Sequence, residues 1–181
     1  SKRCSKLFVG PGNAGTAQCG TNVALNPLDF EAVKQFVLQN SIDMVVVGPE
    51  EPLVRGIWDF FQHDAQLQAV PVIGPSKAGA VLEGSKAWAK QFMERHRIPT
   101  AAYKEFGVDD LKAGLQYLSG HDLPIVLKAD GLAAGKGVVI CQNHKSAQRE
   151  FKEMLGGKFG AAGARVVVEQ FLSGIEFSVF V

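Results

Sequence analysis

The sequence contains few of the residues from which disulfide frameworks and metal sites are built. Three cysteines and four histidines occur in 181 residues, and no two cysteines form a C-x-x-C pair. An odd number of cysteines without metal-ligand spacing argues against a disulfide scaffold and against a zinc site. Free thiols suit a reducing compartment, so the sequence predicts a cytoplasmic protein.

The chain also lacks an excess of one charge and lacks any long apolar run. Lys and Arg number 19 against 18 Asp and Glu, whereas bulk nucleic-acid binding needs a large positive excess. No stretch approaches the eighteen or so apolar residues of a membrane span, and no signal peptide or lipidation motif is present. We therefore expect neither a nucleic acid nor a membrane as partner. With 46% hydrophobic residues, the chain is rich enough for one large domain or two small ones.

Short apolar runs alternate with amphipathic segments in the first 75 residues. "KLFVG" reads as a strand, and "IDMVVVGP" and "AVPVIGP" are apolar runs typical of strands buried on both faces. Between the strands, residues 29–40 and 50–65 carry apolar side chains at helical spacing, and Asp29 is a plausible helix cap. This order predicts an α/β fold with a parallel sheet, in which ligands bind at the carboxyl ends of the strands.

A second unit follows a boundary that we predict near residues 98–100. It is preceded by a helix over 85–99, which Ser85 caps and Pro99 ends. After the boundary we expect strands in "AYKEF", "PIVLKA", "GVVIC" and "ARVVVEQFL" and helices in "DDLKAGLQYLSG" and "SAQREFKEMLGG". The second unit is therefore expected to be α+β.

The stretch "KADGLAAGKGVVI", residues 128–140, combines three glycines with two lysines. It is not a phosphate loop of the G-x-x-x-x-G-K-[ST] type, because only three residues separate Gly131 from Gly135 and Gly137 follows Lys136. Such a loop must also open a helix, whereas "VVIC" is β-branched and strand-like. We predict a hairpin whose backbone N–H groups and Lys136 cover a polyphosphate, with Lys128 directed to the same charge.

Three longer motifs, "LEGSKAWAKQFMERHRIPTA", "PIVLKADGLAAGKGVVI" and "VVVEQFLSGIEFSVF", together resemble the ATP-grasp superfamily. With "PGNAGT" and "VVGPEEPLV" upstream, the chain resembles the phosphoribosylamine–glycine ligases, or glycinamide ribonucleotide synthetases, of purine biosynthesis. This resemblance implies an ADP-forming C–N ligase that joins glycine to 5-phosphoribosylamine through a glycyl phosphate. It also implies a Rossmann-like, parallel-sheet domain followed by an α+β ATP-grasp lid subdomain.

The resemblance implies a division of the chain and of the site. We expect a substrate-binding domain at 1–75 without its first strand, a connecting helical region at 76–98, a lid subdomain at 99–172 and the start of a truncated ATP-grasp core at 173–181. The ligands of Mg²⁺, which the family uses with ATP, are expected beyond Val181. We therefore expect this chain alone to be inactive.

The resemblance assigns ATP to residues of the second unit. Lys86, in the first turn of a helix, and Lys128, within an apolar strand, are the expected catalytic residues and contact the phosphates. Glu169 accepts from the exocyclic amine of adenine, and Glu176 takes both ribose hydroxyls. The remaining ATP-binding residues are expected to be Gly131, Gly135, Lys136, Gly137, Gln170, Phe171 and Leu172.

Phosphoribosylamine is expected to bind Asn13, Thr16 and Glu50, and Asp130 resembles a substrate-side aspartate. For Asn13 and Asp130, an ordinary structural role in forming a turn is an equal alternative to substrate binding. Two rival functions stay open: another ATP-grasp amine ligase or carboxylase, and a non-catalytic ATP-binding domain.

Overall fold

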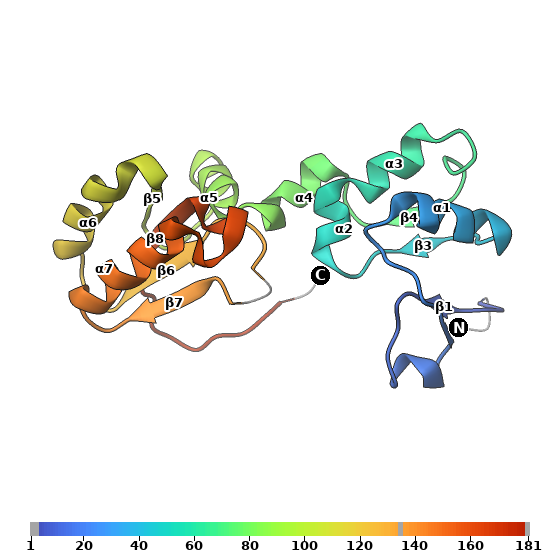
Figure 1. Cartoon of the computed structure of the whole chain (residues 1–181), viewed down its shortest axis with the longest axis horizontal. Coiled ribbons are helices and arrows are strands. Elements are labelled where there is room, and N and C mark those ends of the chain that lie inside the picture. Colours follow the sequence, from blue (N-terminus) through green and yellow to red (C-terminus); the bar gives the residue numbers. More distant parts are fainter. Residues whose placement is uncertain (1–3, 134–135, 180–181) are drawn as a thin grey trace. The chain divides into compact units, whose positions relative to one another are not determined.

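The computed structural model describes residues 4–133 and 136–179, and the chain folds as two compact units, Ser1–Ala80 and Val81–Val181 (Figure 1). Each unit has its own hydrophobic core, and both contain helices and strands, which confirms the predicted α/β class. Within the described residues, no helix combines the length and the apolar character that a membrane crossing requires.

Among the residues that the structure describes, the first unit contains four strands of two residues each. Strand β1 (Phe8–Val9) pairs in parallel with β2 (Thr21–Asn22), and β3 (Val45–Val46) pairs in parallel with β4 (Val72–Ile73). The three predicted strands are present, and the parallel pairing of β3 and β4 is confirmed. The single layer that we predicted is not formed by the described residues, because β1 pairs with β2 and belongs to a separate two-stranded sheet.

Helices cover one face of β3 and β4. Helix α1 (Phe30–Gln39) begins at Asp29, whose side chain accepts from the Ala32 N–H as predicted. The predicted helix over 50–65 is wrong in one respect, because it is broken into α2 (Glu50–Arg55) and α3 (Ile57–His63). The break lies at Gly56, whose φ of 95° is a left-handed conformation that glycine adopts readily. The chain continues into α4 (Lys77–Gly84). The buried core comprises Val33, Val37, Leu53, Ile57, Phe61, Leu67, Val72 and Ala80.

The prediction that these strands are buried on both faces is wrong for β3 and β4, because one face is exposed among the described residues. Val46 is 65% exposed, and its partner in register, Ile73, is 53% exposed. The neighbouring pair is better covered, since Val72 lies in the core. The apolar runs therefore predicted the two strands correctly. They overstated the burial of these strands, because one face is exposed among the described residues.

The second unit is built on a four-stranded antiparallel sheet in the order β5–β8–β6–β7. All four strands were predicted, and their observed bounds are Tyr103–Gly107 for β5, Ile125–Ala129 for β6, Val138–Cys141 for β7 and Arg165–Gln170 for β8. The helices are α5 (Lys86–Arg95), α6 (Leu111–Ser119) and α7 (His144–Glu153), with short turns η2 (Val108–Asp110), η3 (Met154–Lys158) and η4 (Gly160–Ala164).

Helices α6 and α7 pack on one face of this sheet, and the alternation of side chains along each strand separates a core face from a polar face (Figure 1). Val166 and Val168 of β8 lie in the core with Phe151 of α7. Glu169 therefore projects to the opposite face. Lys128 lies on that opposite face as well, because it is paired in register with Val167, two residues before Glu169.

Candidate functional site

The glycine-rich segment is a hairpin, as predicted. Strands β6 and β7 pair from Ile125 with Cys141 to Lys128 with Val138, and the Ala129 N–H donates to the Gly137 carbonyl at 2.8 Å. A side chain at Gly137 would collide with Ala133, so the close approach of the two arms requires glycine there. Gly135 lies outside the described residues. The described part of the segment is not helical, which excludes the helix-opening phosphate loop.

Lys86 reaches the base of this hairpin. It is the first residue of α5, where Ser85 caps the helix by accepting from the Trp88 N–H at 3.1 Å. The Lys86 ammonium donates to the Gly131 carbonyl at 2.8 Å. Gly131 itself has a φ of 89°, so the hairpin turns sharply at the point that the lysine holds. The helix N-terminus and the loop therefore meet at one place.

Asp130 fastens the same junction from the loop side. Its carboxylate accepts from the Ser85 hydroxyl at 3.0 Å and from the Ala87 N–H at 3.1 Å, while its own N–H donates to the Arg165 carbonyl at 2.9 Å. A carboxylate at the N-terminus of a helix is stabilised by the helix dipole. These contacts explain Asp130 as an anchor of the loop. Its predicted contact with substrate stays a prediction.

A buried charge cluster lies on the polar face of the sheet. The Glu169 side chain is 6% exposed, and its Oε2 lies 2.8 Å from the Lys128 ammonium and 3.3 Å from the Lys90 ammonium. The Lys90 side chain is 7% exposed, whereas that of Lys128 is 29% exposed. Glu169 Oε1 is buried and has no hydrogen-bond partner among the described residues. The structure thus brings Lys128 and Glu169 together and adds a second lysine.

Lys90 is the residue that sequence reasoning missed. It lies on the buried side of α5 with Ala87, three residues earlier, a position where an apolar residue is usual. Desolvation lowers the pKa of Lys90, and the nearby Glu169 carboxylate opposes that shift. Helical spacing carried no signal for it, because Lys90 lies almost opposite Trp88 and Phe92 on the helix. Only the structure shows that it is buried and paired with Glu169.

The end of β8 carries the predicted adenine segment. Gln170 is the last residue of the strand, and its N–H donates to the Ala102 carbonyl at 2.9 Å. Phe171 is 37% exposed and Leu172 is 64% exposed. Glu176 is exposed in an irregular segment, and no hydrogen bond of the described residues holds its side chain. Lys136 is likewise exposed on the hairpin. The predicted roles of these residues stay predictions.

The polar groups of the first unit are largely occupied by one another. Asn13 Oδ1 accepts from the Gly15 and Thr16 N–H groups, while Thr16 Oγ1 accepts from the Asn13 N–H at 2.7 Å. The Thr16 hydroxyl also donates to Asn22 Oδ1 at 2.8 Å. The loop is thus fixed by its own side chains. Glu50, the first residue of α2, is exposed.

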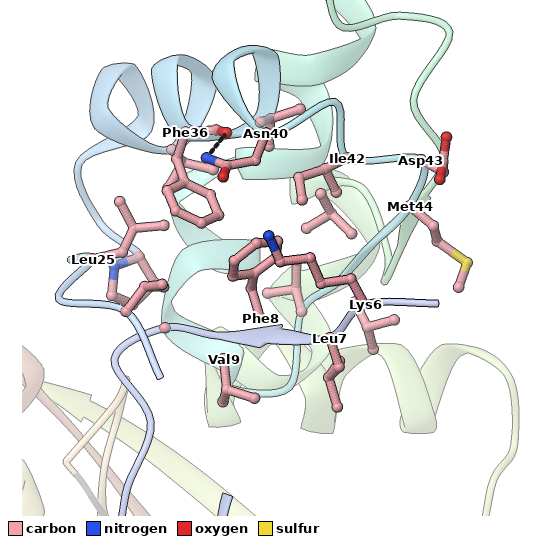
Figure 2. A pocket seen from close by; sticks show the side chains of 18 of the residues that line it. Lys6, Leu7, Phe8, Val9, Leu25, Phe36, Asn40, Ile42, Asp43 and Met44 are labelled. Carbon is pink, nitrogen blue, oxygen red and sulfur yellow. Dashed lines mark hydrogen bonds between the residues drawn. The ribbon is translucent and has the colours of Figure 1, made fainter. Parts of the chain in front are cut away.

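Two pockets differ in character. One of about 660 Å³ lies in the first unit between β1, α1 and β3, where Phe8 and Phe36 meet edge to face (Figure 2). Its lining is mostly apolar and includes none of Asn13, Thr16 and Glu50. The other, of about 530 Å³, lies at the base of the hairpin and is lined by Asp130, Gly131, Leu132, Ala162, Ala164 and Arg165. Only the second pocket adjoins the predicted phosphate loop.

The described residues offer no cluster of side chains for a divalent metal. Over residues 4–133 and 136–179, no three side chains of His, Cys, Asp or Glu come together as a candidate metal site. The charge cluster has a single carboxylate with two ammonium groups, which is unsuited to a cation. The site instead offers positive charge, which suits an anion such as a phosphate.

Sequence comparisons match both units to one family. The sequence model of the phosphoribosylglycinamide synthetase N domain matches residues 1–83, and that of the phosphoribosylglycinamide synthetase ATP-grasp (A) domain matches residues 84–181. The phosphoribosylamine–glycine ligase of Pseudomonas aeruginosa is 47% identical over 99% of this chain and 41% of its own length. That of Allochromatium vinosum is 48% identical over 98% and 41%, respectively. The chain spans about two fifths of the length of these relatives.

Solved structures give the same result. The phosphoribosylamine–glycine ligase of Thermotoga maritima aligns with a TM-score of 0.70 and 29% identity, over 96% of this chain and 40% of that one. An N5-carboxyaminoimidazole ribonucleotide synthetase, solved as an ADP complex, aligns with a TM-score of 0.62 and 18% identity, over 91% and 40%. The second likeness is one of fold alone.

Proposed function

The chain belongs to the phosphoribosylglycinamide synthetase family, and from this premise we propose that it is part of an ATP-dependent, ADP-forming ligase. The enzyme joins glycine to 5-phosphoribosylamine and yields glycinamide ribonucleotide, ADP and phosphate, a step of purine biosynthesis. Its partners are these small molecules, and its compartment is the cytoplasm.

The observation that carries the proposal is the junction of the α5 N-terminus with the glycine hairpin. Lys86, the helix dipole and the hairpin amides offer positive charge at one place, and Lys128 follows on the adjoining strand. In the proposed complex the Lys86 ammonium exchanges the Gly131 carbonyl for a phosphate oxygen. Gly131, Gly135, Lys136 and Gly137 cover the phosphates from the hairpin.

The chemistry proceeds in two displacements. The glycine carboxylate attacks the γ-phosphorus of ATP, the bond to the β-phosphate oxygen breaks, and glycyl phosphate and ADP form. The amine of phosphoribosylamine then attacks the activated carbonyl, loses a proton, and phosphate leaves. Lys86 and Lys128 stabilise the charge on the transferred phosphoryl oxygens, and the hairpin excludes water from the acyl phosphate.

The adenine site uses the orphan carboxylate oxygen. Glu169 Oε1 is buried and has no donor in the part of the chain that the structure describes, and an exocyclic amino group is a donor that fits it. The exposed strand end at Gln170, Phe171 and Leu172 offers backbone groups to the rest of the base edge, and Glu176 accepts from the ribose hydroxyls.

Magnesium, which the family uses with ATP, supplies neutralisation of the phosphate charge when bound. We propose that its carboxylate and asparagine ligands lie outside these 181 residues, as the resemblance implies. We therefore expect that this chain alone does not turn over.

The remaining residues divide by domain as the resemblance implies: a substrate domain at 1–75, a helical connection at 76–98, a lid at 99–172 and the start of the core at 173–181. Asn13, Thr16, Glu50 and Asp130 are proposed to serve phosphoribosylamine. The apolar pocket between β1 and β3 supports a further strand in the substrate domain. Each of those strands has a hydrogen-bonded partner on one edge only among the described residues.

The test is ADP release by the full-length enzyme with ATP, glycine and phosphoribosylamine supplied singly and together. Release that requires glycine and phosphoribosylamine, and that falls at least about a hundredfold in Lys128→Met, supports the proposal. The exposed Lys112→Met is the matched control and keeps full activity. ATP binding without glycine-dependent turnover identifies a non-catalytic domain, and turnover with another acid or amine identifies a different ATP-grasp enzyme.

A further inference from the structure

We propose that Lys90 is a positioning residue for nucleotide binding, which keeps Glu169 paired while Lys128 transfers to the phosphates. This inference rests on the proposed function, since it concerns the same ATP site. It assigns a role to a residue that lies within the motif "LEGSKAWAKQFMERHRIPTA" but was not among the predicted site residues.

The ammonium group of Lys90 is fully used within the protein. It lies 2.7 Å from Thr100 Oγ1, 3.1 Å from the Ala101 carbonyl and 3.3 Å from Glu169 Oε2, which makes three acceptors for its three hydrogens. It also lies 5.6 Å from the centre of the Tyr103 ring. Because its side chain is only 7% exposed, a nucleotide reaches it only if one of these contacts breaks.

Lys128 is placed differently. Its side chain is 29% exposed, and Glu169 Oε2, at 2.8 Å, is its one ion-pair partner among the described residues. It can therefore rotate to an incoming phosphate by giving up a single contact. That movement leaves the Glu169 carboxylate, 6% exposed, in a place where an unpaired charge is strongly unfavourable.

Lys90 removes this penalty because it stays behind on the same oxygen. With Oε2 still paired, the carboxylate keeps its orientation, and the unpartnered Oε1 remains directed to receive a donor. An exocyclic amine satisfies that oxygen, whereas the carbonyl at the same position of guanine repels it. Lys90 thus links two demands of the site, release of Lys128 to the phosphates and selection of adenine over guanine.

The variant Lys90→Met in the full-length enzyme tests the inference. Lys128 must then choose between Glu169 and the phosphates, so we expect the KM for ATP to rise about tenfold. We expect kcat to change less than about threefold, the KM for glycine to stay constant, and the preference for ATP over GTP in kcat/KM to fall at least about threefold. Lys90→Arg keeps the charge and is expected to restore most of the loss. Lys112→Met, an exposed lysine of α6, is the matched control.

The outcomes separate this inference from the proposed function. An inactive wild-type enzyme defeats the proposed function and leaves direct ATP and GTP binding as the readout for Lys90. An active enzyme whose KM for ATP is unchanged in Lys90→Met, or in which kcat alone falls, overturns the positioning role. Should circular dichroism show that Lys90→Met is unfolded, Thr100→Val, which removes one anchor of the ammonium, carries the test. It is expected to raise the KM for ATP in the same direction by about threefold, and an unchanged KM overturns the role.

Discussion

Replacing Glu169 with glutamine removes the carboxylate that the structure places between two ammonium groups. Lys90 then loses its one counter-charge among the described residues and keeps only neutral acceptors, Thr100 and the Ala101 carbonyl. Lys128 loses its partner as well, but its side chain is 29% exposed and water takes over. The loss therefore falls mainly on Lys90.

Breaking a buried ion pair by removing one partner costs about 3–5 kcal/mol, whereas exposed pairs contribute only about 0–1 kcal/mol. We expect about 3 kcal/mol for Glu169→Gln, because Lys90 can release its proton and so limit the penalty. For a chain of this size the loss lowers Tm by roughly 6–12 °C. Lys90→Met is expected to cost only about 1 kcal/mol, since Lys128 still neutralises the carboxylate.

Urea unfolding followed by circular dichroism measures these free energies, and pH supplies an internal check. Desolvation lowers the pKa of Lys90 below the value of 10.5 that it has when unfolded. The unfolded chain therefore binds more protons just below pH 10.5, and the free energy of unfolding contributed by this group rises with pH there. The deficit of Glu169→Gln is thus expected to shrink as the pH approaches 10.5. The reasoning would be refuted if Glu169→Gln lost no more free energy of unfolding than Lys128→Met. A loss that does not change with pH would refute it as well.

Three further predictions follow from the second unit. Gly114→Ala is expected to destabilise the chain by about 2 kcal/mol in urea unfolding, because the added Cβ overlaps the buried Phe151 ring. This loss outweighs the better helix propensity of alanine. An unchanged urea midpoint would contradict this packing. Desolvation and the hydrogen bond to Glu94 raise the pKa of Tyr103 from 10.0 to about 12, so the native state holds a proton that the unfolded chain loses. Stability is therefore lost as the pH rises from 10 to 12, and Tyr103→Phe is expected to lose less over that range. Asp130→Ala is expected to speed hydrogen exchange of the Ala87 amide at least about tenfold, and unchanged exchange would show that the carboxylate does not hold this junction.

Local signals in the sequence were sufficient for the starts of α1 and α5 and for the strands of the second unit. Asp29 and Ser85 act as caps because each side-chain oxygen satisfies an orphan N–H of the first turn, an interaction within four residues. Gly56 was misjudged for a related reason. The apolar spacing continues across it, so periodicity alone did not show that the helix breaks there.

The non-local features were beyond the sequence. Strand β2 consists only of Thr21 and Asn22, which carry no apolar pattern. The sequence therefore gave no indication that β1 pairs with β2 in a separate sheet. The position of Lys90 against Glu169 depends on how α5 lies on the sheet, which no spacing in the chain specifies. The hairpin, in contrast, was predictable because β-branched residues follow the glycines directly.

The most direct test of the central claim is a crystal structure of the full-length enzyme with a non-hydrolysable ATP analogue. The account predicts phosphate oxygens within hydrogen-bond distance of the Lys86 and Lys128 ammonium groups, with Glu169 Oε1 accepting from the adenine amine and Lys90 still bound to Oε2. A triphosphate bound elsewhere, with Lys128 still paired to Glu169, would contradict it.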